Sequence, residues 1–211
     1  MATAAPFPLT TFELHALLSL REGPAAARSA QSLRLDTTGD AAAVSRRAGL
    51  ASLLVRDLAT ISDGIITAQG NAGGVAGALT RGDRWVEIGI VRPSSTDAAV
   101  LVGTGIGGVM ITPRGFDVWN VLPIGEGRDL VDAGVALARQ GVEASAENAA
   151  VAASVKVSTV DSTRAASAHR DDDGTWKIAT EPADAEGRLT VQEGTYPDLD
   201  AAFAALREAL S

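Results

Sequence analysis

A glycine-rich stretch is the part of the sequence whose residue types and spacing come nearest to a ligand-binding motif. Gly103, Gly105 and Gly108 form a G-x-G-x-x-G pattern directly after the apolar run Val100–Val102. In dinucleotide-binding folds this pattern lies between a strand and a helix, and the N-terminus of that helix binds the pyrophosphate. Here the residues that follow, Val109–Thr112, are typical of a strand. The sequence therefore predicts a glycine-rich hairpin at this position.

Acidic residues and histidines are a second source of chemistry. Asp171–Asp173 are consecutive, whereas a calcium loop alternates its oxygen ligands and ends on a glutamate. Together with Gly174 they are typical of a solvated hairpin turn. The two histidines, His15 and His169, have neither a His-x-x-x-His spacing for zinc nor a G-x-S-x-G elbow for nucleophilic catalysis. We expect each histidine to be exposed or partly packed, and neither to be catalytic.

Composition narrows the classes of function. The chain has 211 residues, a net charge of −8 and no cysteine, so disulfides and thiolate chemistry are excluded. Its acidity argues against nucleic-acid binding. Residues 1–20 lack the basic start of a signal peptide, and no apolar run is long enough to span a membrane. We expect a cytoplasmic protein without membrane insertion.

Hydrophobic periodicity predicts the elements that would position a site. Thr10 and Glu13 have the spacing of a capping box at the start of a helix that ends before Gly23-Pro24. Further helices are expected at Ala41–Ala59, Asp129–Arg139 and Asp198–Leu210. Strands are expected at Ser32–Asp36, Ile65–Thr67, Val75–Thr80, Trp85–Val91, Ala98–Val102, Val109–Thr112, Phe116–Leu122, Val155–Val157, Thr163–His169, Thr175–Ala179 and Leu189–Val191, with turns at Arg81–Arg84 and Pro113–Gly115.

These elements predict an α+β fold of antiparallel β-meanders with helices packed on one face. The segment from Trp119–Val121 to Asp129 has the same strand, glycine turn and helix order as the segment from Leu189–Val191 to Asp198. A duplication would produce two halves related by a pseudo-twofold axis. We therefore expect a single α+β domain over residues 1–211, which could divide into subdomains 1–141 and 142–211.

Aromatic and apolar residues indicate where the core lies. Trp85, Trp119 and Trp176 fall in expected strands, and we favour core packing over partner contact for each. The last helix has an apolar stripe, which we expect to pack on the sheet that carries Trp176 and Val191. The residues of that stripe are Leu199, Phe203, Leu206 and Leu210.

The layout resembles one family, the EspG proteins of actinobacterial type VII (ESX) secretion. The resemblance rests on the helix start Leu9–Leu14, the β-rich block Val75–Leu122, and the closing segments Gly174–Trp176, Leu189–Val191 and Leu199–Leu210. It implies two related α+β halves and a cytosolic chaperone that binds the helical tips of secreted proteins. No position matches a family motif closely enough to transfer a functional residue.

From the sequence we expect a non-enzymatic chaperone or adaptor for a secreted helical partner. No catalytic, cofactor-binding, metal-binding or partner-binding residue is assigned. One alternative is a small-molecule or nucleotide-binding protein that uses Gly103–Gly108. Another is a structural subunit that assembles through an exposed sheet edge, and a homodimer also remains open.

Overall fold

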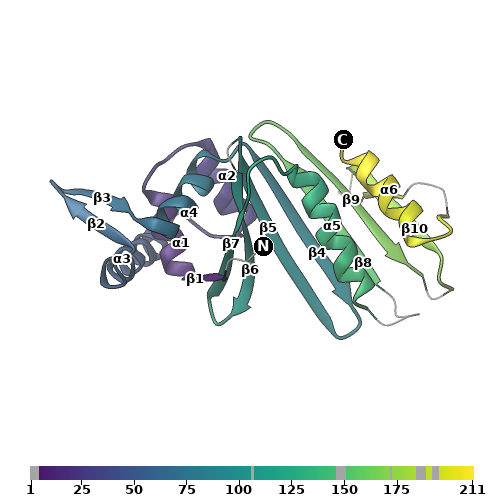
Figure 1. Cartoon of the computed structure of the whole chain (residues 1–211), viewed down its shortest axis with the longest axis horizontal. Helices are drawn as coiled ribbons and strands as arrows, with labels where there is room; N and C mark the ends of the chain where they lie inside the picture. Colours follow the sequence, from purple (N-terminus) through teal and green to yellow (C-terminus); the bar gives the residue numbers. More distant parts are fainter. Residues whose placement is uncertain (1–4, 106, 146–150, 172, 184–188, 192–194) are drawn as a thin grey trace. The chain divides into compact units, whose positions relative to one another are not determined.

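The structure, a computed structural model, describes residues 5–105, 107–145, 151–171, 173–183, 189–191 and 195–211. Contacts divide the chain into two units (Figure 1). Unit 1 is Met1–Trp85 with Val100–Gly127, and unit 2 is Val86–Ala99 with Arg128–Ser211. These units do not coincide with the subdomains 1–141 and 142–211 expected from the sequence.

Unit 1 places four helices and a small hairpin beside one run of antiparallel strands. The strand order is β1, β7, β6, β5, and each neighbouring pair is antiparallel. The strands are β1 (Phe7–Thr10), the end of β5 (Ser95–Thr104), β6 (Gly107–Gly115) and β7 (Val118–Ile124). The remaining elements are α1 (Thr11–Ser19), α2 (Pro24–Ser32), α3 (Gly39–Val55), the hairpin β2 (Ala59–Ser62) with β3 (Ile65–Ala68), and α4 (Gly70–Arg81).

Unit 2 is an antiparallel meander with two helices against it. Its strands are β4 (Arg84–Arg92, from Val86 onward), the start of β5 up to Ala99, β8 (Val151–Ser158), β9 (Thr163–Arg170), β10 (Trp176–Ala183) and β11 (Leu189–Val191). Helix α5 (Leu130–Glu143) packs on β8, while α6 (Leu199–Ala209) packs on β9 and β10 and contacts α5. Both helices lie on the same face of these strands in Figure 1. The predicted α+β class is confirmed, whereas the duplication stays a prediction.

Glycines in α5 let this helix lie close to β4. A Cβ atom at Gly141 would lie 2.1 Å from Cδ1 of Ile90, and one at Gly134 would lie 2.6 Å from Cγ1 of Val86. Both distances are shorter than real Cβ contacts allow. The buried side chains of β4 therefore occupy the space that these two glycines leave free.

Polar side chains begin the helices as the sequence predicts. The Thr10 hydroxyl accepts from the Glu13 N–H at 3.2 Å, which confirms the capping box. The Asp129 carboxylate accepts from the N–H groups of Val131 and Asp132 at the start of α5. Asp198 does the same for Ala201 at the start of α6. These caps satisfy N–H groups that have no partner inside a helix.

Two expected strands are helical or irregular. The segment Val75–Thr80, expected as a strand with a turn at Arg81–Arg84, belongs to α4. The buried positions of α4 include Ala72, Val75, Ala76 and Leu79, which have the i, i+3, i+4, i+7 spacing of a helix. The intervening glycines weaken helix propensity and concealed this period.

The segment that follows Pro24 differs from the sequence-based expectation for another reason. The first helix ends at Ser19, before Gly23-Pro24, as expected. Gly23-Pro24 also starts a further helix, α2, with Pro24 in the first turn where its missing N–H is harmless. The expected strand Ser32–Asp36 is the end of α2 and the turn after it, and Arg34 has a φ of 55°. The alternation of Leu33 and Leu35 therefore arises from a helix end.

Buried hydrogen bonds connect the elements of unit 1. Trp85 is fully buried, and its Nε1 donates to the Ser29 hydroxyl at 2.8 Å. The Ser29 hydroxyl in turn donates to the backbone oxygen of Leu79 at 2.7 Å. One chain of hydrogen bonds thus joins the start of β4, α2 and α4, which leaves these buried polar groups satisfied.

Helices α1 and α3 are in close contact at Gly49. Adding one methyl group at this position, by substitution with alanine, should therefore lower the stability of the protein. A Cβ atom at Gly49 would lie 1.8 Å from the backbone oxygen of Phe12. We expect Gly49→Ala to destabilise the protein by about 1–3 kcal/mol, because the two helices must separate. Chemical denaturation measures this change.

The matched control is another helical glycine, Gly74 in α4, where an added Cβ would meet nothing within 4 Å. Gly74→Ala should stabilise the protein by about 0.4–1 kcal/mol, through helix propensity and the entropy of the unfolded chain. Equal effects of the two substitutions would contradict the close helix contact at Gly49.

Candidate protein-binding surface

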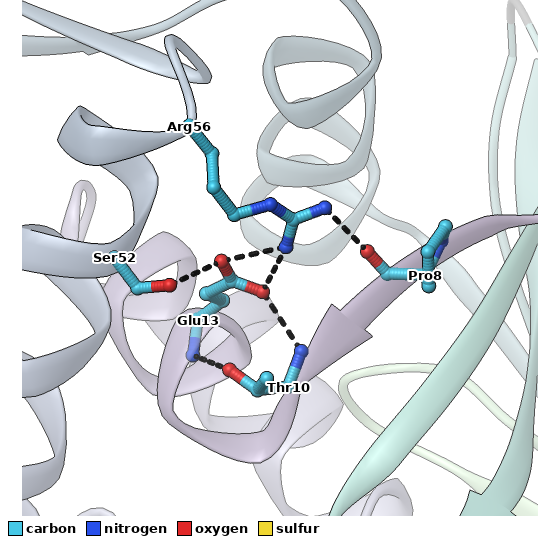
Figure 2. Close-up of polar contacts among 5 residues, drawn as sticks. All are labelled: Pro8, Thr10, Glu13, Ser52 and Arg56. Carbon is cyan, nitrogen blue, oxygen red and sulfur yellow. Dashed lines mark hydrogen bonds and ion pairs between the residues drawn. The ribbon is translucent and has the colours of Figure 1, made fainter.

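A buried carboxylate lies at the junction of β1, α1 and α3 (Figure 2). Glu13 is fully buried and accepts four hydrogen bonds. The Thr10 N–H donates to Oε2 at 2.8 Å, and the Ser52 hydroxyl donates to Oε1 at 2.7 Å. Nη1 of Arg56 donates to both carboxylate oxygens at 2.8 Å, while its Nη2 donates to the Pro8 oxygen at 3.1 Å.

This network keeps Glu13 charged. Burial by itself raises the pKa of Glu13, but the hydrogen bonds from Thr10, Ser52 and Arg56 outweigh it, so that the pKa lies below its ordinary value of 4.5. Because Ser52 and Arg56 belong to the last turn and C-cap of α3, the carboxylate fixes the end of this helix. The hairpin β2–β3 leaves the helix directly after this point.

The hairpin β2–β3 exposes large apolar side chains. Ile61 is 56% exposed and Ile65 is 68% exposed. Ile61 pairs with Ile66, and Ile65 pairs with Ser62. Residues that pair directly share a face of the ribbon, so Ile61 and Ile65 lie on opposite faces. The hairpin is therefore a two-stranded ribbon with an exposed isoleucine on each side.

Exposed apolar side chains and net charge are divided unequally between the units. Of the large apolar side chains that are exposed in the described part of the chain, six lie in unit 1 and two in unit 2. The six are Phe12, Val44, Val55, Ile61, Ile65 and Phe116, and the two are Val91 and Val160. By sequence, unit 1 has nine basic and nine acidic residues, whereas unit 2 has nine basic and seventeen acidic residues. Unit 1 is therefore neutral and better suited to apolar contact.

A groove of about 630 Å³ lies within unit 1. Glycines line much of it, including Gly74 and Gly77 of α4 and Gly107 and Gly108 of β6. Arg81 is also among the lining residues. The sequence motif at Gly103–Gly108 and the misassigned helix α4 thus contribute to one hollow, which the sequence did not predict.

The backbone of the glycine motif confirms the predicted hairpin. Gly103 pairs with Gly108, and Thr104 pairs with Gly107, in the antiparallel ladder of β5 and β6. Gly107 has a φ of 125°, a value that side chains disfavour. No helix follows the motif, because Gly107 and Gly108 already belong to β6. The motif itself therefore supplies no helix N-terminus for a pyrophosphate. The helix N-terminus that lines this groove belongs to α4, through Gly70 and Gly73.

Neither histidine and no described residue of the acidic turn is among the residues that line this groove. His15 is buried in α1, so the expectation that it is exposed or partly packed was wrong. Burial, assisted by Arg46, lowers the pKa of His15. His169 is partly packed, as expected, and its Nε2 lies 3.4 Å from Oδ1 of Asp171. The Gly174 N–H donates to the Asp171 oxygen, which confirms the predicted turn, while Asp172 lies outside the described residues.

The tryptophans occupy strands as predicted. Trp85 and Trp176 are buried, which confirms their core role, whereas Trp119 is half-buried and donates from Nε1 to the Thr11 hydroxyl at 2.9 Å. Within the described residues no group of three or more His, Cys, Asp or Glu side chains is arranged to hold a metal ion. In the same part of the chain no helix is long and apolar enough to cross a membrane.

Comparison with known proteins identifies a fold relative. The chain is similar to the type VII secretion system chaperone EspG5 of Mycobacterium tuberculosis, in a solved complex with the PE25–PPE41 dimer, with a TM-score of 0.59. The match covers 98% of this chain and 95% of that chain at 12% sequence identity. Neither a family model nor a curated protein matches the sequence. The structural resemblance to EspG that the sequence predicted is therefore confirmed, and the two chains share a fold.

Proposed function

We propose that this protein is a non-enzymatic cytosolic chaperone or adaptor of type VII (ESX) secretion that binds a secreted partner protein. The observation that carries the proposal is the fold shared with EspG5 over nearly the whole of both chains. EspG5 was solved with a protein partner, the PE25–PPE41 dimer. A secreted partner with an exposed apolar surface would need a chaperone to bind that surface and prevent aggregation until secretion.

The surface chemistry of unit 1 supports the same proposal. Its net neutrality and its exposed isoleucines suit a partner whose own exposed surface is apolar. The excess acidic charge of unit 2 would keep the complex in solution. The Glu13–Arg56 network would hold the β2–β3 hairpin in place, which reduces the entropy lost on binding.

Co-expression with candidate secreted helical proteins of the source organism tests this function. We expect a stoichiometric complex by gel filtration with light scattering, and a secreted protein that aggregates when expressed alone. Ile61→Ser with Ile65→Ser should weaken the complex by about thirtyfold or more, the effect of losing an interface hot spot. Val160→Ser, an exposed apolar residue in unit 2, serves as the matched control. Failure to form a complex with any such protein would contradict the proposal.

The groove of unit 1 favours a second candidate, the binding of a small molecule or nucleotide. Its volume of about 630 Å³ lies in the usual range of ligand pockets. Thermal scans with nucleotides and dinucleotides discriminate between the two functions, because a ligand at a hundred times its Kd stabilises by about 2.7 kcal/mol. Under the chaperone proposal these ligands leave the melting midpoint unchanged. The same gel filtration of the protein alone tests the self-assembling alternative.

A further inference from the structure

The turn between β6 and β7 has an unusual backbone for its sequence. Gly115, Phe116 and Asp117 have φ values of 99°, 51° and 58°. Gly115 pairs with Val118, so Phe116 and Asp117 form a two-residue hairpin turn. Turns of this kind favour Asn-Gly or Asp-Gly, because side chains other than those of Gly, Asn and Asp are disfavoured at positive φ. The sequence had predicted the turn at Pro113–Gly115 and a strand from Phe116, and both positions were wrong.

The side chain of Phe116 is unfavourable at this turn for a second reason, which is its exposure to water. Phe116 is 103% exposed, so its ring is fully in water. A fully exposed aromatic ring adds nothing to the core, and Asn or Gly would suit this backbone better. Within the folded chain, therefore, Phe116 has no stabilising role that accounts for it.

The surrounding residues nevertheless hold the turn in one conformation. The Thr11 N–H donates to the Asp117 oxygen at 2.8 Å, and the Thr11 hydroxyl donates to the same oxygen at 3.3 Å. Nε1 of Trp119 donates to the Thr11 hydroxyl at 2.9 Å. The β6–β7 register also shifts between Pro113 and Gly115, as at a β-bulge. Strained backbone that its surroundings hold in place is concentrated at functional sites.

We propose that Phe116 is a preorganised anchor that inserts into an apolar pocket of a partner protein. The inference rests on the chaperone function proposed above and names a contact of that complex. A rigid aromatic side chain at the end of a narrow turn fits a concave surface, and it loses little entropy on binding. Phe12, the residue after Thr11, is also exposed and offers a second apolar contact.

A protein pocket fits this turn better than a lipid surface. Segments that lie in a membrane interface combine several apolar side chains with clustered basic residues. The turn Pro113–Asp117 has one aromatic residue, one arginine and one aspartate, and unit 1 has no net charge. The occupant is therefore a partner protein, and a lipid or a second copy of this chain is an outcome that would overturn the proposal.

Photo-crosslinking in the source cells tests the contact directly. The full chain would carry p-benzoylphenylalanine in place of Phe116, or in place of Val160 at another exposed turn as the control. We expect position 116 to crosslink to an apolar segment of a secreted protein, identified by mass spectrometry, and position 160 not to do so. A crosslink to lipid or to a second copy, or no crosslink in a chain that still co-purifies with a secreted protein, overturns the inference while leaving the proposed function intact. Absence of any co-purifying secreted protein defeats the proposed function itself.

A pair of substitutions separates binding from folding. Phe116→Asn with Asp117→Gly installs the favoured turn residues, so the melting midpoint should rise by about 2–4 °C. Affinity for the crosslinked partner should fall by about thirtyfold or more. Val160→Asn should leave this affinity unchanged. A lower midpoint would mean that Phe116 supports the fold, and an unchanged affinity would mean that it is not an anchor. Either result would overturn the proposal.

Discussion

Truncation of Phe203 to alanine is expected to destabilise the protein by about 3–5 kcal/mol. Phe203 is 3% exposed on the inner face of α6, and its ring meets that of Trp176 edge-on, with centroids 6.3 Å apart and an interplanar angle of 75°. The substitution removes this aromatic contact and leaves a cavity beside Leu206, which is fully buried. Since a domain is stable by about 5–15 kcal/mol, much of the stability would be lost. Denaturant or thermal unfolding measures the loss.

Glu208 on the exposed face of the same helix provides the control. Glu208→Ala should change the unfolding free energy by less than about 0.5 kcal/mol. An unchanged midpoint for Phe203→Ala, together with loss of the partner complex, would move Phe203 from the core to the interface. Its burial against Trp176 argues for the core, as the apolar stripe of the last helix had predicted. The side chain of Val191, the other contact expected there, lies outside the described residues.

The second large effect is expected at Glu13. Glu13→Ala should destabilise the protein by about 3 kcal/mol, because buried donors of Thr10 and Ser52 lose a charged acceptor and Arg56 loses its ion pair. The guanidinium of Arg56 is partly exposed, which allows water to replace part of the lost contact. Arg139→Ala, which breaks exposed ion pairs with Glu143 and Asp200, is the control and should cost less than about 1 kcal/mol.

The same carboxylate makes stability depend on pH. Because the pKa of Glu13 is lower in the folded state, its contribution is complete above the ordinary value of 4.5 and is lost as the pH falls through the folded value. Unfolding curves recorded from neutral to acidic pH should show this loss in the native protein and less of it in Glu13→Ala. Parallel curves for the two proteins would show that Glu13 does not titrate as the structure indicates.

Local signals in the sequence predicted much of the fold. The capping box at Thr10 and the acidic caps at Asp129 and Asp198 lie within a few residues of the groups they satisfy, so spacing alone identifies them. Helix α4 was missed because its glycines interrupt the apolar period, and only packing against the rest of unit 1 reveals the buried stripe. Tertiary contacts overrode local propensity there.

The candidate protein-binding surface, which comprises the β2–β3 hairpin and the Glu13 network at its base, was less predictable from the sequence. It depends on contacts between residues that are distant in the sequence. Ile65 was correctly placed in a strand, but its exposure follows from a ribbon that pairs with no further strand among the described residues. The partner of Glu13 is Arg56, 43 positions later, and no spacing rule connects them. The positive φ of Phe116 contradicts its residue type, so sequence reasoning placed it in a strand.

Strand β4 is far in the sequence from β8 and α5, the elements of unit 2 that lie against it, and this separation has a consequence for synthesis on the ribosome. Val86, Ile88 and Ile90 are buried in unit 2, yet they leave the ribosome inside a stretch that otherwise builds unit 1. Their counterpart α5, whose Gly141 leaves space for Ile90, emerges only about fifty residues later. At about 5–20 residues per second this delay lasts roughly 3–10 s. During that interval β4 has only β5 as a neighbouring strand, because β8 follows α5 in the sequence. The β4 edge that β8 will occupy and the apolar side chains that α5 will cover stay exposed, and such surfaces favour aggregation of a nascent chain.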